Sequence, residues 1–352
     1  MTWKMKQLAV IAGVICAVLL ASAGCATTLA AEDEADAATA ATRQEWDNGD
    51  APFALEMVVN ETQMDFTLDE LEQTPYYIEG FGGYTTSAGT YYEQYYGGIR
   101  LAQFIESFVP LTEDQTITLV AMDGYAMSYK AGELMDTKEG TWILAFNADG
   151  NRLPRDPGYI RGIKISEEGS GVPVPNMHGH SSPRMIQRIE ITAEMFRDFT
   201  LTITGKMNHE LDRATIQSGI MCTAHRTTVT YEDSRSGTLT SYTGIPLYLM
   251  LAYSDHPLYA PHRQADYTIE SYNREAALQG YLVEVIAADG FSVTLNSREL
   301  DGNNGVILAM YIEDEELGDR DWPLRLVWDK DADPVPEGIR AVRNVKEIKL
   351  IF

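Results

Sequence analysis

Residues 117–134 read ITLVAMDGYAMSYKAGEL, and residues 283–300 read VEVIAADGFSVTLNSREL. The two stretches align without gaps, and an Asp-Gly pair stands at the same place in each, at 123–124 and at 289–290. An Asp-Gly pair between two alternating apolar runs is a strong hairpin signal, because glycine accepts the positive φ that a tight turn requires. The sequence therefore predicts the same β-hairpin twice.

Further blocks repeat in the same order around both hairpins. They pair YGGIRLAQFI (96–105) with YTGIPLYLML (242–251), WILAF (142–146) with VILAM (306–310), and IQRIEI (186–191) with VKEIKL (345–350). Ordered self-similarity of this kind is the signature of an internal duplication. We therefore expect two tandem mostly-β domains, residues 51–195 and 196–352, of α+β class with mixed sheets and short helices.

The N-terminus has the pattern of an export signal. Lys4 and Lys6 precede an uncharged apolar stretch at 8–23, which is short for a membrane span. Small residues then lead into Cys25, which fits lipoprotein processing and a lipid on that cysteine. Ordinary signal cleavage and an uncleaved anchor are the alternatives. All three predict a signal segment at 1–25 and an extracytoplasmic protein, secreted, periplasmic or anchored to the cell membrane.

Residues 26–50 are mostly Ala, Thr, Glu and Asp. Such a stretch has too little apolar surface to offset the entropy of ordering, so we expect a disordered acidic linker. The formal net charge of the whole chain is −25. This charge argues against nucleic acid and anionic membrane surfaces as partners, and it favours solubility outside the cell.

Several segments of the second copy resemble the sulfite-oxidase-type molybdopterin-binding domain family. The segments that carry the resemblance are GIPL (244–247), DGFSV (289–293), ILA (307–309), WPLRLV (322–327) and VKEI (345–348). Their order matches that of the family, and the first copy shows the resemblance more weakly. The resemblance implies a sulfite-oxidase-like fold, and a molybdenum-molybdopterin cofactor that performs oxygen-atom transfer.

The family's metal-binding cysteine stands in a segment like CAGNR, and this chain has CTAHR at 222–226. The resemblance therefore implies that Cys222 ligates molybdenum and is catalytic. It also implies that His225, Arg226, Arg325 and Arg343 face the cofactor. A soft thiolate suits a high-valent metal, and arginine holds anionic oxygens in a bidentate manner. We expect the sulfur in a concave site with Arg226 and at least one of the other two arginines nearby.

The sequence also departs from the family pattern. The loop after WPLRLV is acidic at Asp329, Asp331 and Asp333, where the family cradles a phosphate, although Lys330, Arg340 and Arg343 offset part of that charge. The first copy contains no cysteine. These departures favour a second hypothesis, in which the chain keeps the fold, lacks the cofactor and acts as a binding or interaction protein.

Other residues leave further alternatives open. Cys222 is also compatible with a small buried side chain on a strand, with a zinc site shared with His225, or with a Cys-His nucleophile. His178 and His180 alternate in a loop, as copper or zinc ligands or as incidental histidines. Tyrosines at 76, 77, 91, 92, 95 and 96 are ordinary strand residues or a surface on which sugars or peptides stack.

Overall fold

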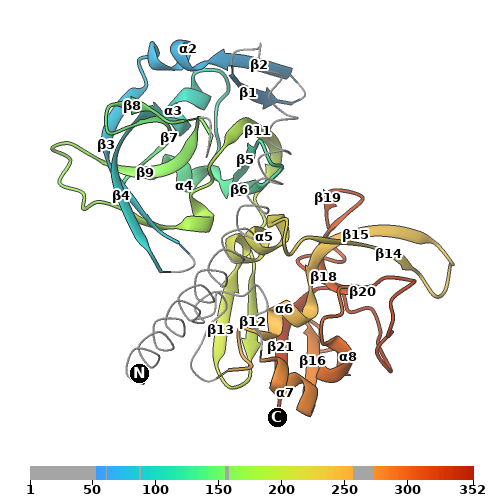
Figure 1. Ribbon diagram of the computed structural model, residues 1–352. Coiled ribbons are helices and arrows are strands. Elements are labelled where there is room, and N and C mark those ends of the chain that lie inside the picture. The colour runs from blue at the N-terminus through green and yellow to red at the C-terminus, as the bar shows by residue number, and fades with distance from the viewer. Residues whose placement is uncertain (1–52, 61, 87–88, 155–157, 257–272) are drawn as a thin grey trace, which may run out of the picture. The chain divides into compact units, whose positions relative to one another are not determined.

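The computed structural model describes residues 53–352, apart from 61, 87–88, 155–157 and 257–272 (Figure 1). The predicted signal segment, the lipidated Cys25 and the acidic linker lie outside the described residues. Among the residues that are described, no helix has both the length and the apolar character of a membrane span.

Two five-stranded sheets have the same strand order. The first has the order β2-β1-β11-β5-β6 and the second has the order β13-β12-β21-β16-β17. In each, the second and third strands of that order run parallel (β1 with β11, β12 with β21) and the other neighbours run antiparallel. The strands are β1 (Ala54–Val59), β2 (Thr62–Thr67), β5 (Gln115–Ala121), β6 (Ala126–Lys130), β11 (Ile186–Met195), β12 (Thr200–Thr204), β13 (Asn208–Asp212), β16 (Leu282–Ala287), β17 (Ser292–Asn296) and β21 (Val345–Ile351).

Each of these sheets is accompanied by a second, more strongly curved one. The first curved sheet consists of β3 (Tyr77–Thr85), β4 (Tyr91–Arg100), β7 (Thr141–Ala148), β8 (Asn151–Arg152), β9 (Arg161–Glu167) and β10 (Asn176–His178). The second consists of β14 (Thr227–Glu232), β15 (Leu239–Pro246), β18 (Val306–Ile312), β19 (Glu315–Glu316) and β20 (Arg325–Trp328). Strand β9 pairs with both β7 and β3, which closes the first curved sheet on itself. In the second, the Lys330 amide after β20 donates to the Thr230 carbonyl of β14, at 2.8 Å.

The predicted hairpin turns occupy equivalent places in the two sheets that share a strand order. Gly124 between β5 and β6 has φ +82°, and Gly290 between β16 and β17 has φ +87°. In each turn the aspartate carboxylate accepts from the amide two residues later, at 3.0 Å for Asp123 and 2.9 Å for Asp289. The carboxylate therefore caps the turn, and the glycine supplies the left-handed backbone that the turn needs.

A glycine also stands at the same point of both curved sheets. Gly98 in β4 and Gly244 in β15 each lie at a shift in strand register. A Cβ on Gly98 would lie 2.6 Å from the Cα of Ala145, and a Cβ on Gly244 would lie 2.6 Å from the Cα of Ala309. Only glycine allows the two backbones to approach so closely, so both blocks keep it. The predicted boundary at residues 195–196 stays a prediction.

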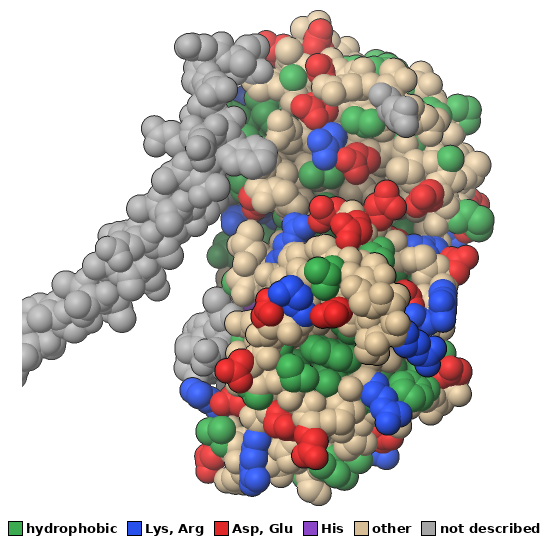
Figure 2. All heavy atoms as spheres, turned by 90° about the vertical axis from the view of Figure 1, so that its right-hand side faces the viewer, with side chains coloured by type: hydrophobic (Ala, Val, Ile, Leu, Met, Phe, Trp, Pro, Cys, Tyr) green, Lys and Arg blue, Asp and Glu red, His purple; other side chains and the backbone are tan. Residues whose placement is uncertain are grey.

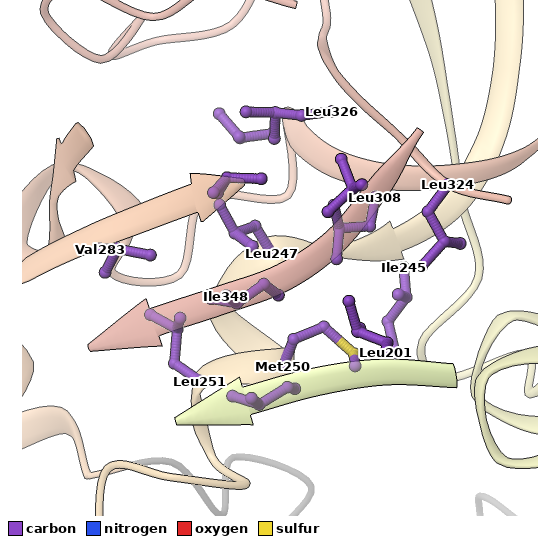
Figure 3. Packing of buried hydrophobic residues seen from close by; sticks show 14 of the residues in the cluster. Leu201, Ile245, Leu247, Met250, Leu251, Val283, Leu308, Leu324, Leu326 and Ile348 are labelled. Carbon is purple, nitrogen blue, oxygen red and sulfur yellow. The ribbon is translucent and has the colours of Figure 1, made fainter. Parts of the chain in front are cut away.

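The helices are short and lie between the strands. They are α2 (Leu68–Glu72), α3 (Leu101–Glu106), α4 (Ala131–Met135), α5 (Arg213–Met221), α6 (Leu247–Leu251), α7 (Arg274–Gln279), α8 (Ser297–Leu300) and the 3-10 turn η1 (Gly179–Ser181). Helix α6 and strands β12, β15, β16, β18 and β21 bury one apolar cluster, which includes Leu201, Leu247, Met250 and Ile348 (Figure 3). The predicted abundance of strands, mixed sheets and short helices is confirmed.

Candidate functional site

Cys222 ends a helix, and its assignment to a strand is wrong. It is the C-cap of α5, and its amide donates to the carbonyl of Ser218 at 3.0 Å. Asp212 caps the start of the helix, where its carboxylate accepts from the amide of Thr215, and the helix buries Ile216 and Ile220 four residues apart. That spacing is helical, and it was the available signal that GIMC continues a helix rather than a strand.

The CTAHR segment forms one tight turn after α5. The carbonyl of Cys222 accepts from the amides of His225 and Arg226, at 2.9 and 2.8 Å. Cys222 is half-buried and Arg226 is exposed, while burial lowers the pKa of His225. The structure thus brings three of the five predicted site residues together, on backbone that presents the C-terminal end of a helix. That end carries partial negative charge, which disfavours an anionic ligand.

Helix α5 also carries polar contacts that the sequence did not reveal. The hydroxyl of Tyr125 lies 2.9 Å from Oγ of Ser218 and 3.2 Å from the carbonyl oxygen of His180. Burial raises the pKa of Tyr125 to about 12, and the neighbouring Cys222 acts in the same direction. His178 and His180 stack with ring centroids 5.3 Å apart, and burial lowers the pKa of His180. In the described part of the chain, no group of three or more His, Cys, Asp or Glu residues could hold a metal ion.

The other two predicted cofactor residues meet on one carboxylate. Nη1 of Arg325 lies 2.9 Å from one oxygen of Asp321, and Nε of Arg343 lies 2.9 Å from the other. Arg325 is only 5% exposed, and its Nη1 also donates to the Tyr242 hydroxyl at 2.5 Å. Its guanidinium lies 5.0 Å from the Tyr242 ring centroid and 5.4 Å from that of Tyr231. Both arginines are therefore held by one carboxylate within the fold, which offsets one of their two positive charges.

A second buried arginine was missed by the sequence analysis. Arg213 forms an ion pair with Glu316, and its guanidinium lies 4.3 Å from the Phe196 ring centroid. Arg197 pairs with the same glutamate at 3.1 Å and stacks on Trp322 at 4.0 Å. Burial lowers the pKa of Arg213. The cluster ties β19 to the start of α5, so its role is structural.

The tyrosines that we singled out separate into different environments. Tyr96 is buried inside the first curved sheet, and Tyr76 packs edge-on against Phe104. Tyr84 and Tyr92 stack on one face of the β3–β4 hairpin, and Arg161 lies over Tyr84 at 4.2 Å. The strand register places Tyr77, Phe81, Tyr91 and Tyr95 on the opposite face, together with Glu79 and Glu93.

The surface carries charges of both signs, although the net charge of the chain is negative. On the face that Figure 2 shows, lysines and arginines lie among the acidic and hydrophobic side chains. Local charge, rather than the total, therefore decides which ligands a given face can bind.

Comparison with known proteins finds similarity among solved structures alone. No protein-family model matches the chain, and no curated protein matches it. Among solved structures, it is similar to the sulfane dehydrogenase SoxCD from Paracoccus pantotrophus, with a TM-score of 0.35 and 12% sequence identity. The match covers 69% of this chain and 58% of that one, so the chain spans less than two thirds of its length.

Proposed function

We propose that this chain is a binding protein, built from two copies of a sulfite-oxidase-like fold, that works without molybdopterin. The equal strand orders, the equivalent Asp-Gly turns and the matching glycines Gly98 and Gly244 support the duplication. The loss of the cofactor is carried by one observation, the pairing of Arg325 and Arg343 with Asp321.

The argument is electrostatic. To hold an anionic cofactor, Arg325 and Arg343 would have to leave Asp321 or accept the new anion beside that carboxylate. Separating the buried Arg325–Asp321 pair would cost about 3–5 kcal/mol, because the arginine left behind would keep an uncompensated charge. Arg325 is also enclosed by Tyr242 and Tyr231, so it cannot turn outward without breaking that packing. Arg325 therefore does not fit the cofactor-binding role that the resemblance assigned to it.

The acidic loop after β20 points the same way. The two oxygens of Asp329 accept from the amides of Thr230 and Asp331, at 2.9 and 2.8 Å, so this carboxylate holds the loop against β14. Lys330, which the sequence suggested as a counterweight, pairs with Asp331. Asp329 therefore has a structural role in this loop, and its charge would repel a phosphate at close range.

The second candidate function is a molybdopterin-dependent oxidoreductase or a subunit of one. It is favoured by the half-buried Cys222 in one turn with His225 and the exposed Arg226. A bound molybdenum cofactor would supply oxygen-atom transfer there, with Cys222 as its ligand and Arg226 beside it. We also propose that the chain is exported and tethered to the membrane through a lipid on Cys25.

Metal analysis separates the two functions. The full chain is produced in a host that assembles molybdopterin, and its molybdenum is measured beside a known molybdenum enzyme. We expect only background metal, equal in the wild type and in Cys222→Ser. A near-stoichiometric molybdenum content that Cys222→Ser abolishes would overturn the proposal.

A further inference from the structure

The outward face of the β3–β4 hairpin carries an aromatic strip edged by carboxylates. We define the strip as Tyr77, Phe81, Tyr91 and Tyr95. Phe81 and Tyr91 are 48% and 46% exposed, and Phe81 lies edge-on to Tyr95 with ring centroids 5.0 Å apart. Large apolar groups gathered on one exposed face usually mark a binding surface.

Two glycines allow the outer rings to lie across the strands. A Cβ on Gly83 would lie 2.7 Å from Cε2 of Tyr91, and a Cβ on Gly97 would lie 3.1 Å from Cζ of Tyr77. Neither glycine has the positive φ that would otherwise explain it. A side chain at either position would push the ring away, so glycine at both positions lets the Tyr77 and Tyr91 rings lie flat against the strands.

The strip is acidic as well as aromatic. The hydroxyl of Tyr77 donates to Glu79 at 2.8 Å, and that of Tyr91 donates to Glu93 at 2.7 Å. The hydrogen bond to Glu93 raises the pKa of Tyr91, and burial followed by the charges of Glu79 and Glu168 raises that of Tyr95. Within the described residues, no arginine or lysine stacks on these rings, whereas Arg161 stacks on Tyr84 of the opposite face.

We propose that this strip binds an extended basic segment of a partner protein. The inference rests on the proposed binding function and names the partner's chemistry. Ring faces attract guanidinium and ammonium groups, and the adjacent carboxylates supply the opposite charge. Glu79 pairs with Gly97 and Glu93 with Gly83, so the two acids lie four residues and one strand apart, about 14 Å. Basic residues four positions apart in an extended peptide span about 13 Å and match that spacing.

A labelled peptide with two arginines four positions apart, and otherwise glycine and serine, is titrated into the full chain by fluorescence anisotropy. Two control peptides place the arginines side by side or replace them with citrulline. We expect the spaced peptide to bind best and to lose affinity as salt is raised, because exposed charges are screened.

Variants then locate the site. Combining Glu79→Gln with Glu93→Gln should weaken binding about tenfold or more, since charge-assisted hydrogen bonds are lost. Phe81→Ala should weaken it about two- to fivefold, as expected for exposed cation–π contacts. Glu210→Gln, on the exposed edge strand β13, removes an equal charge elsewhere and should leave affinity unchanged.

Two results would overturn the inference. In the first, the spaced peptide binds no more tightly than the citrulline control, or its affinity is unchanged in the Glu79, Glu93 and Phe81 variants. The other is binding of a neutral gluco-oligosaccharide on this strip, insensitive to salt and lost in Phe81→Ala. Molybdenum content of the same preparation separates failure of this inference, with metal at background, from failure of the proposed function, with metal near stoichiometric.

Discussion

Asp321→Asn removes the one negative charge that Arg325 and Arg343 share. Arg325 is 5% exposed and would become an uncompensated buried cation, whereas the Arg343 side chain is 36% exposed and can turn to solvent. Breaking a buried pair typically costs 3–5 kcal/mol, so we expect a loss near the lower end, about 3 kcal/mol. For a domain of this size the midpoint of thermal unfolding should fall by about 6–12 °C.

The assay is urea and thermal unfolding followed by circular dichroism. The matched control is Asp319→Asn, because Asp319 has a fully exposed side chain that pairs with Arg197 at 3.5 Å. That variant should change the free energy of unfolding by less than about 0.5 kcal/mol. Adding Arg325→Met to Asp321→Asn should recover part of the loss, since the orphaned charge is removed. The reasoning is refuted if Asp321→Asn is no more destabilising than Asp319→Asn.

Three further outcomes are expected. Burial raises the pKa of Asp255 from 3.8 to about 6, so the folded state holds the proton of this carboxyl more tightly than the unfolded state does. The free energy of unfolding should therefore fall as pH rises from about 4 to 6, by at most about 3 kcal/mol. Unfolding at pH 4 and pH 7 should show this slope, and Asp255→Asn should flatten it; an unchanged slope contradicts the assignment. Gly244→Ala should cost at least about 2 kcal/mol by crowding Leu308, while Gly318→Ala, which opens into free space, should be neutral; equal effects would remove the close-approach argument. Intact-mass measurement of membrane-associated protein should give a chain that begins at a lipidated Cys25, and a mass that includes Met1 would rule out cleavage.

The sequence revealed those parts of the fold that depend on local chemistry. The Asp-Gly turns at 123–124 and 289–290 need a short acceptor and a positive φ, and both requirements are visible in the residue types. The repeated glycine before each short apolar helix was also visible, although its reason, the close approach of a neighbouring strand, was not.

The candidate site was harder to predict, because which charged groups pair with one another depends on residues that are distant in the sequence. Cys222 was assigned to a strand, since the apolar run around it was read without the Asp212 cap and the buried pair Ile216 and Ile220. Asp321 lies four residues before Arg325, but nothing local shows that Arg343 reaches the same carboxylate. The flat strip likewise depends on which residues face each other across β3 and β4.

The molybdenum content of the full chain, made in a host that assembles molybdopterin, tests the central claim most directly. If Asp321 keeps Arg325 and Arg343 occupied, the purified wild type should contain only background metal under conditions that load a known molybdenum enzyme. Close to one molybdenum atom per chain, lost in Cys222→Ser, would contradict the account.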